Sequence, residues 1–235
     1  MVEHSGRALV LVGMSVREAS ARDELAALAR DQDATLAFLQ LADPSVGREL
    51  TRLADAGHER IVLVGVSLGT MAPVVTWLRR IASYWWQQRG PAAPVIEVAT
   101  VLLSGTTPAD LELALEVTRP ITGTEAPLSS PAWEDVPEHR HQVLLCRGPR
   151  CSAQGADASA EALVLALMAA GLGDDDVLVT HTGCQFPCNR SPVVSVQPDD
   201  VWYGGVDDDV ARRIVAEHLV GGVPVADHRL PRTRS

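Results

Sequence analysis

Apolar runs alternate with amphipathic stretches along the first half of the chain. The stretches have the spacing of amphipathic helices. One helix is expected to open at Asp43-Pro44, a capping residue followed by a proline at the first helical position. The apolar runs are near-continuous, as in strands buried on both faces of a sheet, and lie at residues 7–13, 34–41, 59–66 and 95–103. This alternation predicts an α/β domain over residues 1–118, with a parallel sheet covered by helices on both faces.

The pattern breaks over residues 119–141. This stretch contains four prolines and has no hydrophobic period. We interpret it as a proline-rich linker between two domains, with Trp133 as a candidate residue for docking on one of them.

Residues 142–235 carry a second pattern and predict a second α/β domain. The last helix begins with Asp207, Asp208 and Asp209, where the helix dipole favours acidic side chains. The expected elements are a strand at 142–146, a helix at 158–170, a strand at 177–181, a hairpin-like pair at 192–197 and 201–203, and a helix at 206–220. The order strand, helix, strand, strand, strand, helix is thioredoxin-like.

The four cysteines of the chain all lie in this second domain, as two closely spaced pairs. Four residues separate Cys146 from Cys151, and three separate Cys184 from Cys188. Each pair follows a predicted strand, in a loop that contains proline. Four thiolates are the full ligand set of one tetrahedral zinc or one iron–sulfur cluster. Zinc favours a C-x2-C spacing, which neither pair has, and disulfides are less expected in a reducing compartment.

A family resemblance rests on the sequences around these cysteines. CRGPRCSAQGA and TGCQFPCNRSPVVSVQPDDVWYGGV, within residues 141–225, resemble the thioredoxin-like [2Fe-2S] ferredoxins. That family includes the Shethna-type ferredoxins and the small cluster subunit of respiratory NADH dehydrogenase. The resemblance implies that Cys146, Cys151, Cys184 and Cys188 ligate a [2Fe-2S] cluster. It also implies a homodimer and electron transfer with a redox partner protein.

A second resemblance covers residues 7–118. VLVGMSVREA and AFLQLADPSVGRELTRLADAGHERIVLVGVSLG resemble the CbiX-type sirohydrochlorin and cobalt chelatases. Two histidines of that family take part in metal insertion, and Met14 and Pro73 stand in their places. Neither can accept a pyrrole proton or ligate a metal as imidazole does. The hypothesis is a degenerate chelatase-like domain that binds a partner or a tetrapyrrole ligand, and no catalytic residue is assigned.

Two local features leave further interpretations open. The segment GVSLG at 65–69 fits the nucleophile elbow of serine hydrolases, with Ser67 as the nucleophile. The histidines available to pair with it lie in the linker or in the second domain. Tyr84, Trp85 and Trp86 are adjacent at the end of a helix, so at least one should be exposed, and a dimer contact is expected there.

The composition of the chain limits the kinds of partner that are expected. The net charge is −10, and all twenty cationic residues are arginine, which disfavours nucleic-acid binding. No apolar stretch is long enough to span a membrane, and the first residues lack the features of a secretory signal, so a cytoplasmic location is expected. An electron carrier is favoured over an enzyme. A protein of tetrapyrrole metabolism and a cluster-based redox or iron sensor remain the alternatives.

Overall fold

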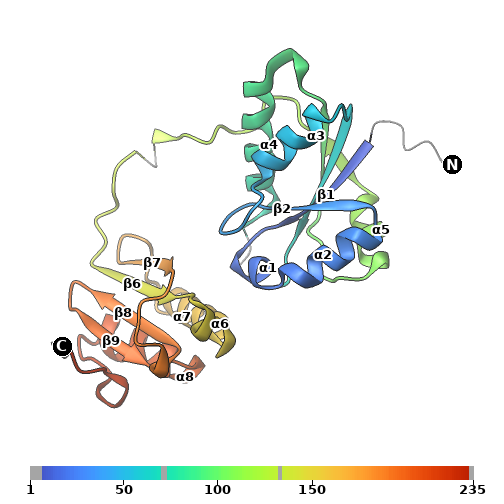
Figure 1. Ribbon diagram of the computed structural model, residues 1–235. Helices are drawn as coiled ribbons and strands as arrows, with labels where there is room; N and C mark the ends of the chain where they lie inside the picture. The colour runs from blue at the N-terminus through green and yellow to red at the C-terminus, as the bar shows by residue number, and fades with distance from the viewer. Residues whose placement is uncertain (1–6, 70–72, 132–133, 233–235) are drawn as a thin grey trace. The chain divides into compact units, whose positions relative to one another are not determined.

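The computed structural model describes residues 7–69, 73–131 and 134–232. The chain divides into two compact units, Met1–Trp133 (unit 1) and Glu134–Ser235 (unit 2), each with its own sheet (Figure 1). Within the described ranges, no helix combines the length and the apolar character that crossing a bilayer requires.

Unit 1 is built on a five-stranded sheet with the order β2-β1-β3-β4-β5. The first four strands are parallel, and β5 runs antiparallel to β4. The elements in chain order are β1 (Arg7–Gly13), α1 (Val16–Ser20), α2 (Arg22–Asp31), β2 (Ala34–Phe38), α3 (Val46–Asp55), β3 (Arg60–Val66), α4 (Val75–Arg89), η1 (Gly90–Ala92), β4 (Val95–Ala99), α5 (Pro108–Leu115) and β5 (Thr118–Pro120). The α/β class predicted from the alternating pattern is confirmed.

Helices cover both faces of this sheet (Figure 1). Side chains of β3 alternate between the two faces, because successive residues of a strand point in opposite directions. Leu63 packs in the core that α3 and α4 cover, and its neighbour Val64 packs with Leu111 in the core that α2 and α5 cover. All three are fully buried. The near-continuous apolar run at 59–66 is therefore explained by burial on both sides.

Three element boundaries differ from the sequence-based expectation. Strand β2 ends at Phe38 and β4 ends at Ala99, so both are shorter than the apolar runs that predicted them. The apolar run after β4 continues as a loop in which the Leu103 N–H donates to the Gly65 carbonyl at 2.8 Å. Helix α3 does not open at Asp43-Pro44. Its N-cap is Ser45, whose Oγ accepts a hydrogen bond from the Arg48 N–H at 3.4 Å.

The start of the segment expected to be a linker, residues 119–141, is part of unit 1. Strand β5 pairs with β4, and the Arg79 guanidinium donates to the carbonyls of Arg119 at 3.0 Å and Pro120 at 2.8 Å. Arg79 also forms an ion pair with Glu125 at 2.6 Å. The contacts of β5 use backbone groups, which every residue has, so the sequence of this proline-rich segment does not indicate that it pairs with unit 1. Trp133 lies outside the described residues.

Unit 2 contains a four-stranded sheet with the order β7-β6-β8-β9. Strands β6 and β7 are parallel, and the other two pairings are antiparallel. The elements in chain order are β6 (His141–Cys146), α6 (Pro149–Ala153), α7 (Ala156–Ala169), β7 (Val177–Thr182), η3 (Cys188–Arg190), β8 (Val193–Gln197), β9 (Val201–Gly204), α8 (Asp208–Arg213), η4 (Ile214–Val220) and η5 (Ala226–His228). The strands and the two long helical stretches match the predicted order. The last helix is α-helical only to Arg213 and continues as the π-helical η4.

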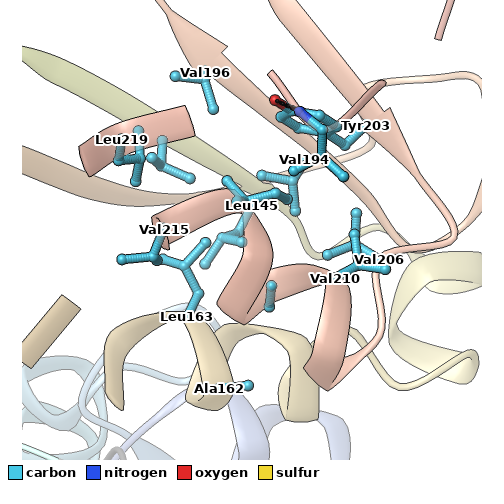
Figure 2. Close-up of a cluster of buried hydrophobic side chains, with 14 of the residues drawn as sticks. Leu145, Ala162, Leu163, Val194, Val196, Tyr203, Val206, Val210, Val215 and Leu219 are labelled. Carbon is cyan, nitrogen blue, oxygen red and sulfur yellow. Dashed lines mark hydrogen bonds between the residues drawn. The ribbon is translucent and has the colours of Figure 1, made fainter. Parts of the chain in front are cut away.

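The main core of unit 2 lies between one face of this sheet and the helices α7, α8 and η4. Figure 2 shows Leu145, Val194 and Tyr203 from the strands meeting Leu163 and Val215 from the helical side. A smaller buried cluster forms around Cys146, Cys151, Ala156 and Val193, with Trp202 packed against it. Cys146 follows Leu145 along β6 and therefore points to the opposite face of the sheet.

A chain of polar contacts links the buried Tyr203 and His218 to the exposed Asp199. The Tyr203 hydroxyl lies 2.8 Å from His218 Nδ1, and His218 Nε2 lies 3.0 Å from Asp199 Oδ2. The Val225 N–H donates to the Tyr203 hydroxyl at 3.3 Å. Burial raises the pKa of Tyr203 to about 12. Burial also lowers the pKa of His218, although the Asp199 carboxylate acts in the opposite direction.

The lowered pKa of His218 predicts that unit 2 loses stability in mild acid. The unfolded chain takes up a proton at this histidine near pH 6.5, whereas the folded chain does so only at lower pH. The free energy of unfolding should therefore fall as the pH drops from about 6.5 towards the pKa of the folded state. Protection factors of the β9 amides, from which the pH dependence of intrinsic exchange has been removed, measure this effect at pH 7.5 and pH 5.5. His218→Asn should lose most of the difference, and an unchanged difference in this variant would contradict the assignment.

Candidate metal centre

Two loops leave the same edge of the sheet of unit 2. Strands β6 and β7 are parallel neighbours in which Cys146 stands opposite Thr182, so both strands end at the same level. The loop after β6 leads to Cys151, and the loop after β7 carries Cys184 and Cys188. The sheet therefore brings together two cysteine pairs that are far apart in the sequence.

The first pair is buried. Cys146 is the last residue of β6 and Cys151 lies in α6, and each is 2% exposed. The pKa of the Cys146 thiol is raised mainly by burial, and the neighbouring Cys151 raises it further. The backbone N–H groups of Gln185 and Gly148 donate towards the Cys146 sulfur and partly offset this effect.

The second pair is accessible. The sulfur atoms of Cys184 and Cys188 are 3.3 Å apart, with Cys184 exposed and Cys188 half-buried. The pKa of Cys188 is lowered by the hydrogen bond with Cys184 and by the Arg150 guanidinium. The Phe186 N–H acts to lower the pKa of Cys184, but the hydrogen bond with Cys188 and the neighbouring thiols leave it raised. One negative charge is therefore favoured on this thiol pair, next to the Arg150 guanidinium.

Two residues that the sequence did not single out join the loops. The Cys151 thiol donates to Ser191 Oγ at 3.3 Å, and the Ser191 hydroxyl donates to the Cys188 carbonyl at 2.7 Å. Gly148 lies against the other loop, because an added Cβ there would be 2.9 Å from the Cβ of Cys184 and 3.0 Å from its Cα. Only glycine permits this approach without displacing a loop.

The predicted ligands thus come together as two pairs. Cys146 is also near enough to Cys184 to raise the pKa of that thiol. Within residues 7–69, 73–131 and 134–232, no three side chains of histidine, cysteine, aspartate or glutamate are grouped closely enough to ligate one ion.

In unit 1, the residues in the positions of the chelatase histidines serve the fold. Met14 is fully buried, and its sulfur would be 3.1 Å from a Cβ added at Gly65. Glu18, also fully buried, accepts hydrogen bonds from the Ser15 N–H at 2.6 Å, the Ser15 hydroxyl at 2.7 Å and the Leu68 N–H at 2.6 Å. These contacts join the segments that follow β1 and β3. Pro73 is half-buried in the segment before α4.

The other two features of unit 1 also have structural explanations. The hydroxyl of Ser67 donates to the Gly69 carbonyl at 2.8 Å. His58, the histidine of unit 1 within the described ranges, precedes β3, whereas Ser67 follows the end of that strand. Trp85 packs on the core and donates from Nε1 to Thr51 Oγ1 at 2.9 Å. Tyr84 is 51% exposed, which confirms that one of the adjacent aromatics faces solvent.

Known proteins are similar to parts of this chain. No protein-family profile matches the chain. A protein of Priestia megaterium named as a 2Fe-2S ferredoxin is 37% identical over 83 residues, which are 35% of this chain and 64% of that protein. The chain therefore spans less than two thirds of the length of this relative.

Two solved structures extend the comparison. The thioredoxin-like [2Fe-2S] ferredoxin from Aquifex aeolicus is 31% identical, and the match covers 39% of this chain and 97% of that one, with a TM-score of 0.37. A CbiX protein of cobalamin biosynthesis from Marinobacter aquaeolei is 19% identical over 47% of this chain and 88% of that one, with a TM-score of 0.34. Part of the chain is thus similar in sequence to 2Fe-2S ferredoxins, as the segments around the cysteines indicated.

The close approach of Gly148 to Cys184 gives a test of the paired arrangement. Gly148→Ala should force the two loops apart and lower the metal retained per chain after anaerobic purification, because the added methyl group meets backbone and Cβ atoms. Gly183→Ala is the matched control, since an added Cβ there meets no atom within 4 Å and the position is next to Cys184. Equal metal content in the two variants would show that the contact does not hold the site together.

Proposed function

We propose that unit 2 holds a [2Fe-2S] cluster on Cys146, Cys151, Cys184 and Cys188 and serves as an electron carrier. The observation that carries the proposal is the pairing of these thiols at one edge of the sheet. The chain has no other cysteine. The relatives named above are called [2Fe-2S] ferredoxins. When bound, such a cluster supplies reversible transfer of one electron.

The donor set suits two irons that each take two thiolates. Two sulfurs on one tetrahedral metal, each about 2.3 Å from it, are roughly 3.8 Å apart. The 3.3 Å between Cys184 and Cys188 is within half an ångström of that distance. A small adjustment of side-chain torsions would therefore turn this thiol pair into a pair of ligands.

Hydrogen-bond donors of the chain are already directed at the sulfurs. Backbone N–H groups of Gly148 and Gln185 point to Cys146, and that of Phe186 points to Cys184. The Arg150 guanidinium donates to Cys188. Each donor stabilises negative charge on its sulfur, so together they favour thiolate ligation and raise the reduction potential of the site.

Anaerobic purification of the full chain tests this proposal. We expect a coloured protein with about two irons and two inorganic sulfides per chain, which dithionite reduces to a paramagnetic state visible by electron paramagnetic resonance. Cys146→Ala should lose the cluster, because it removes one of four ligands and puts no other donor atom in its place. Ser152→Ala, a change at the next residue after Cys151, should retain it. A colourless protein with stoichiometric zinc would refute the cluster.

For unit 1 we propose a chelatase-like module that binds a partner or ligand and inserts no metal by the histidine mechanism. The support is structural: Met14 fills the core at the end of β1, and Glu18 ties the adjoining segments together. No imidazole stands in either of the expected places, so no side chain there accepts the pyrrole protons.

A chelatase assay tests the role of unit 1. With sirohydrochlorin and Co²⁺, we expect the full chain to insert metal at the uncatalysed rate. Introducing the family's residue through Met14→His tests whether the scaffold still permits the chemistry, and we expect no gain because the site is closed by packing. Insertion well above the uncatalysed rate by the unmodified chain would disprove the degenerate assignment.

A further inference from the structure

We infer that the cysteine end of unit 2 is a docking surface for an acidic redox partner, a protein whose electron-transfer site is surrounded by carboxylates. The inference rests on the proposed function. Phe186 provides the apolar centre of this surface, and Arg150 and Arg190 provide its charge. We call these three residues the cysteine-end surface.

The charge of this end is opposite in sign to that of the chain as a whole. The segments that carry the cysteines, 141–156 and 177–197, contain three arginines and no aspartate or glutamate, although the net charge of the chain is −10. Arg150 and Arg190 are both exposed. Elsewhere in unit 2, by contrast, Arg213 pairs with Glu217 and Asp227, and Arg232 pairs with Asp200.

Phe186 is held in an unusual position between Cys184 and Cys188. Its side chain is 71% exposed, and its backbone has φ +52, in the left-handed region that a bulky residue rarely adopts. Such a conformation is energetically unfavourable for a bulky side chain and is found mainly at functional sites. An aromatic ring placed outward at this cost, beside the proposed cluster, is a suitable anchor for a partner protein.

The charges close to the docking surface matter more to a partner than the net charge of the whole chain. Exposed charges farther than about 8 Å are largely screened at physiological ionic strength, so a docked partner interacts with Arg150 and Arg190 rather than with carboxylates beyond that distance. Asp227, which lines the same hollow as Arg190, is itself paired with Arg213.

Thiolates that hold a cluster add negative charge at this end. Cys146 and Cys151 are buried, and Cys184 is exposed. Arg150 donates to Cys188 and so offsets part of that charge. Carboxylates of a partner would therefore pair with the exposed guanidinium groups beside the site.

The same charges argue against a second copy of this chain as the occupant. In a two-fold dimer each surface patch faces its own copy, so the arginines of one protomer would approach those of the other. Like charges placed opposite each other across an interface weaken it. A carboxylate-bearing partner has no such penalty.

Voltammetry of the cluster-loaded full chain on coated gold electrodes tests the inference. A film ending in carboxylates imitates an acidic partner, and a film ending in amines is its opposite. We expect a cluster signal on the carboxylate film despite the net charge of −10. Arg190→Gln, which leaves the Arg150 hydrogen bond to Cys188 in place, should lower the electron-transfer rate there by about threefold or more. Arg212→Gln, which changes an exposed arginine of α8, should leave it unchanged.

Phe186 is tested on a film that mixes carboxylate and methyl ends. We expect methyl ends to increase adsorption of the wild-type chain, and Phe186→Asn, which tolerates the left-handed backbone, to lose that increase. A signal on the amine film alone, or no signal on either film while dithionite still reduces the cluster in solution, would overturn the docking surface. Failure of that reduction in solution would instead overturn the proposed function, and the inference with it.

Discussion

The parallel pairing of β6 with β7 is the constraint on which the candidate site depends. Parallel neighbours end at the same edge of a sheet, so the segments that follow them are adjacent whatever their separation along the chain. Here that rule places Cys146 and Cys184 at one edge although 37 residues of chain lie between them. Without this pairing the chain would hold two separate thiol pairs, and neither would be a complete ligand set for a cluster.

The pairing is maintained by a core that does not involve the cysteines. Val143 and Leu145 of β6 pack beneath helix α7, on the face opposite Cys146. Most of the core of unit 2 is therefore separate from the cysteines, and the site is supported by the strands and helices of that core. Two residues then hold the loops close together. Ser191 hydrogen-bonds to Cys151 and Cys188, and Gly148 has no side chain that would keep its loop away from Cys184.

The sequence predicted the features that depend on a local pattern of residues. It did not predict the features that depend on contacts between distant segments. Hydrophobic period identified β1 to its end residues and β7 to within one residue, because burial acts on every position of a strand. The cysteine spacing identified all the thiols that the structure pairs. The attachment of β5 could not be predicted, since it rests on carbonyl groups that every residue has. The role of Gly148 was equally invisible, because a glycine in a loop gives no sign of what lies against it.

The two units use the same part of an α/β sheet in different ways. In both, segments that follow parallel strands meet at one edge, where such sheets commonly place their ligands. In unit 1, Met14 fills this edge and Glu18 joins the segments after β1 and β3, so polar groups are satisfied internally. In unit 2, Cys184 is left exposed and Arg150 is directed at a thiol. Unit 2 therefore presents an exposed thiol at this edge, whereas the polar groups of Ser15 and Glu18 at the edge of unit 1 are bonded within the fold.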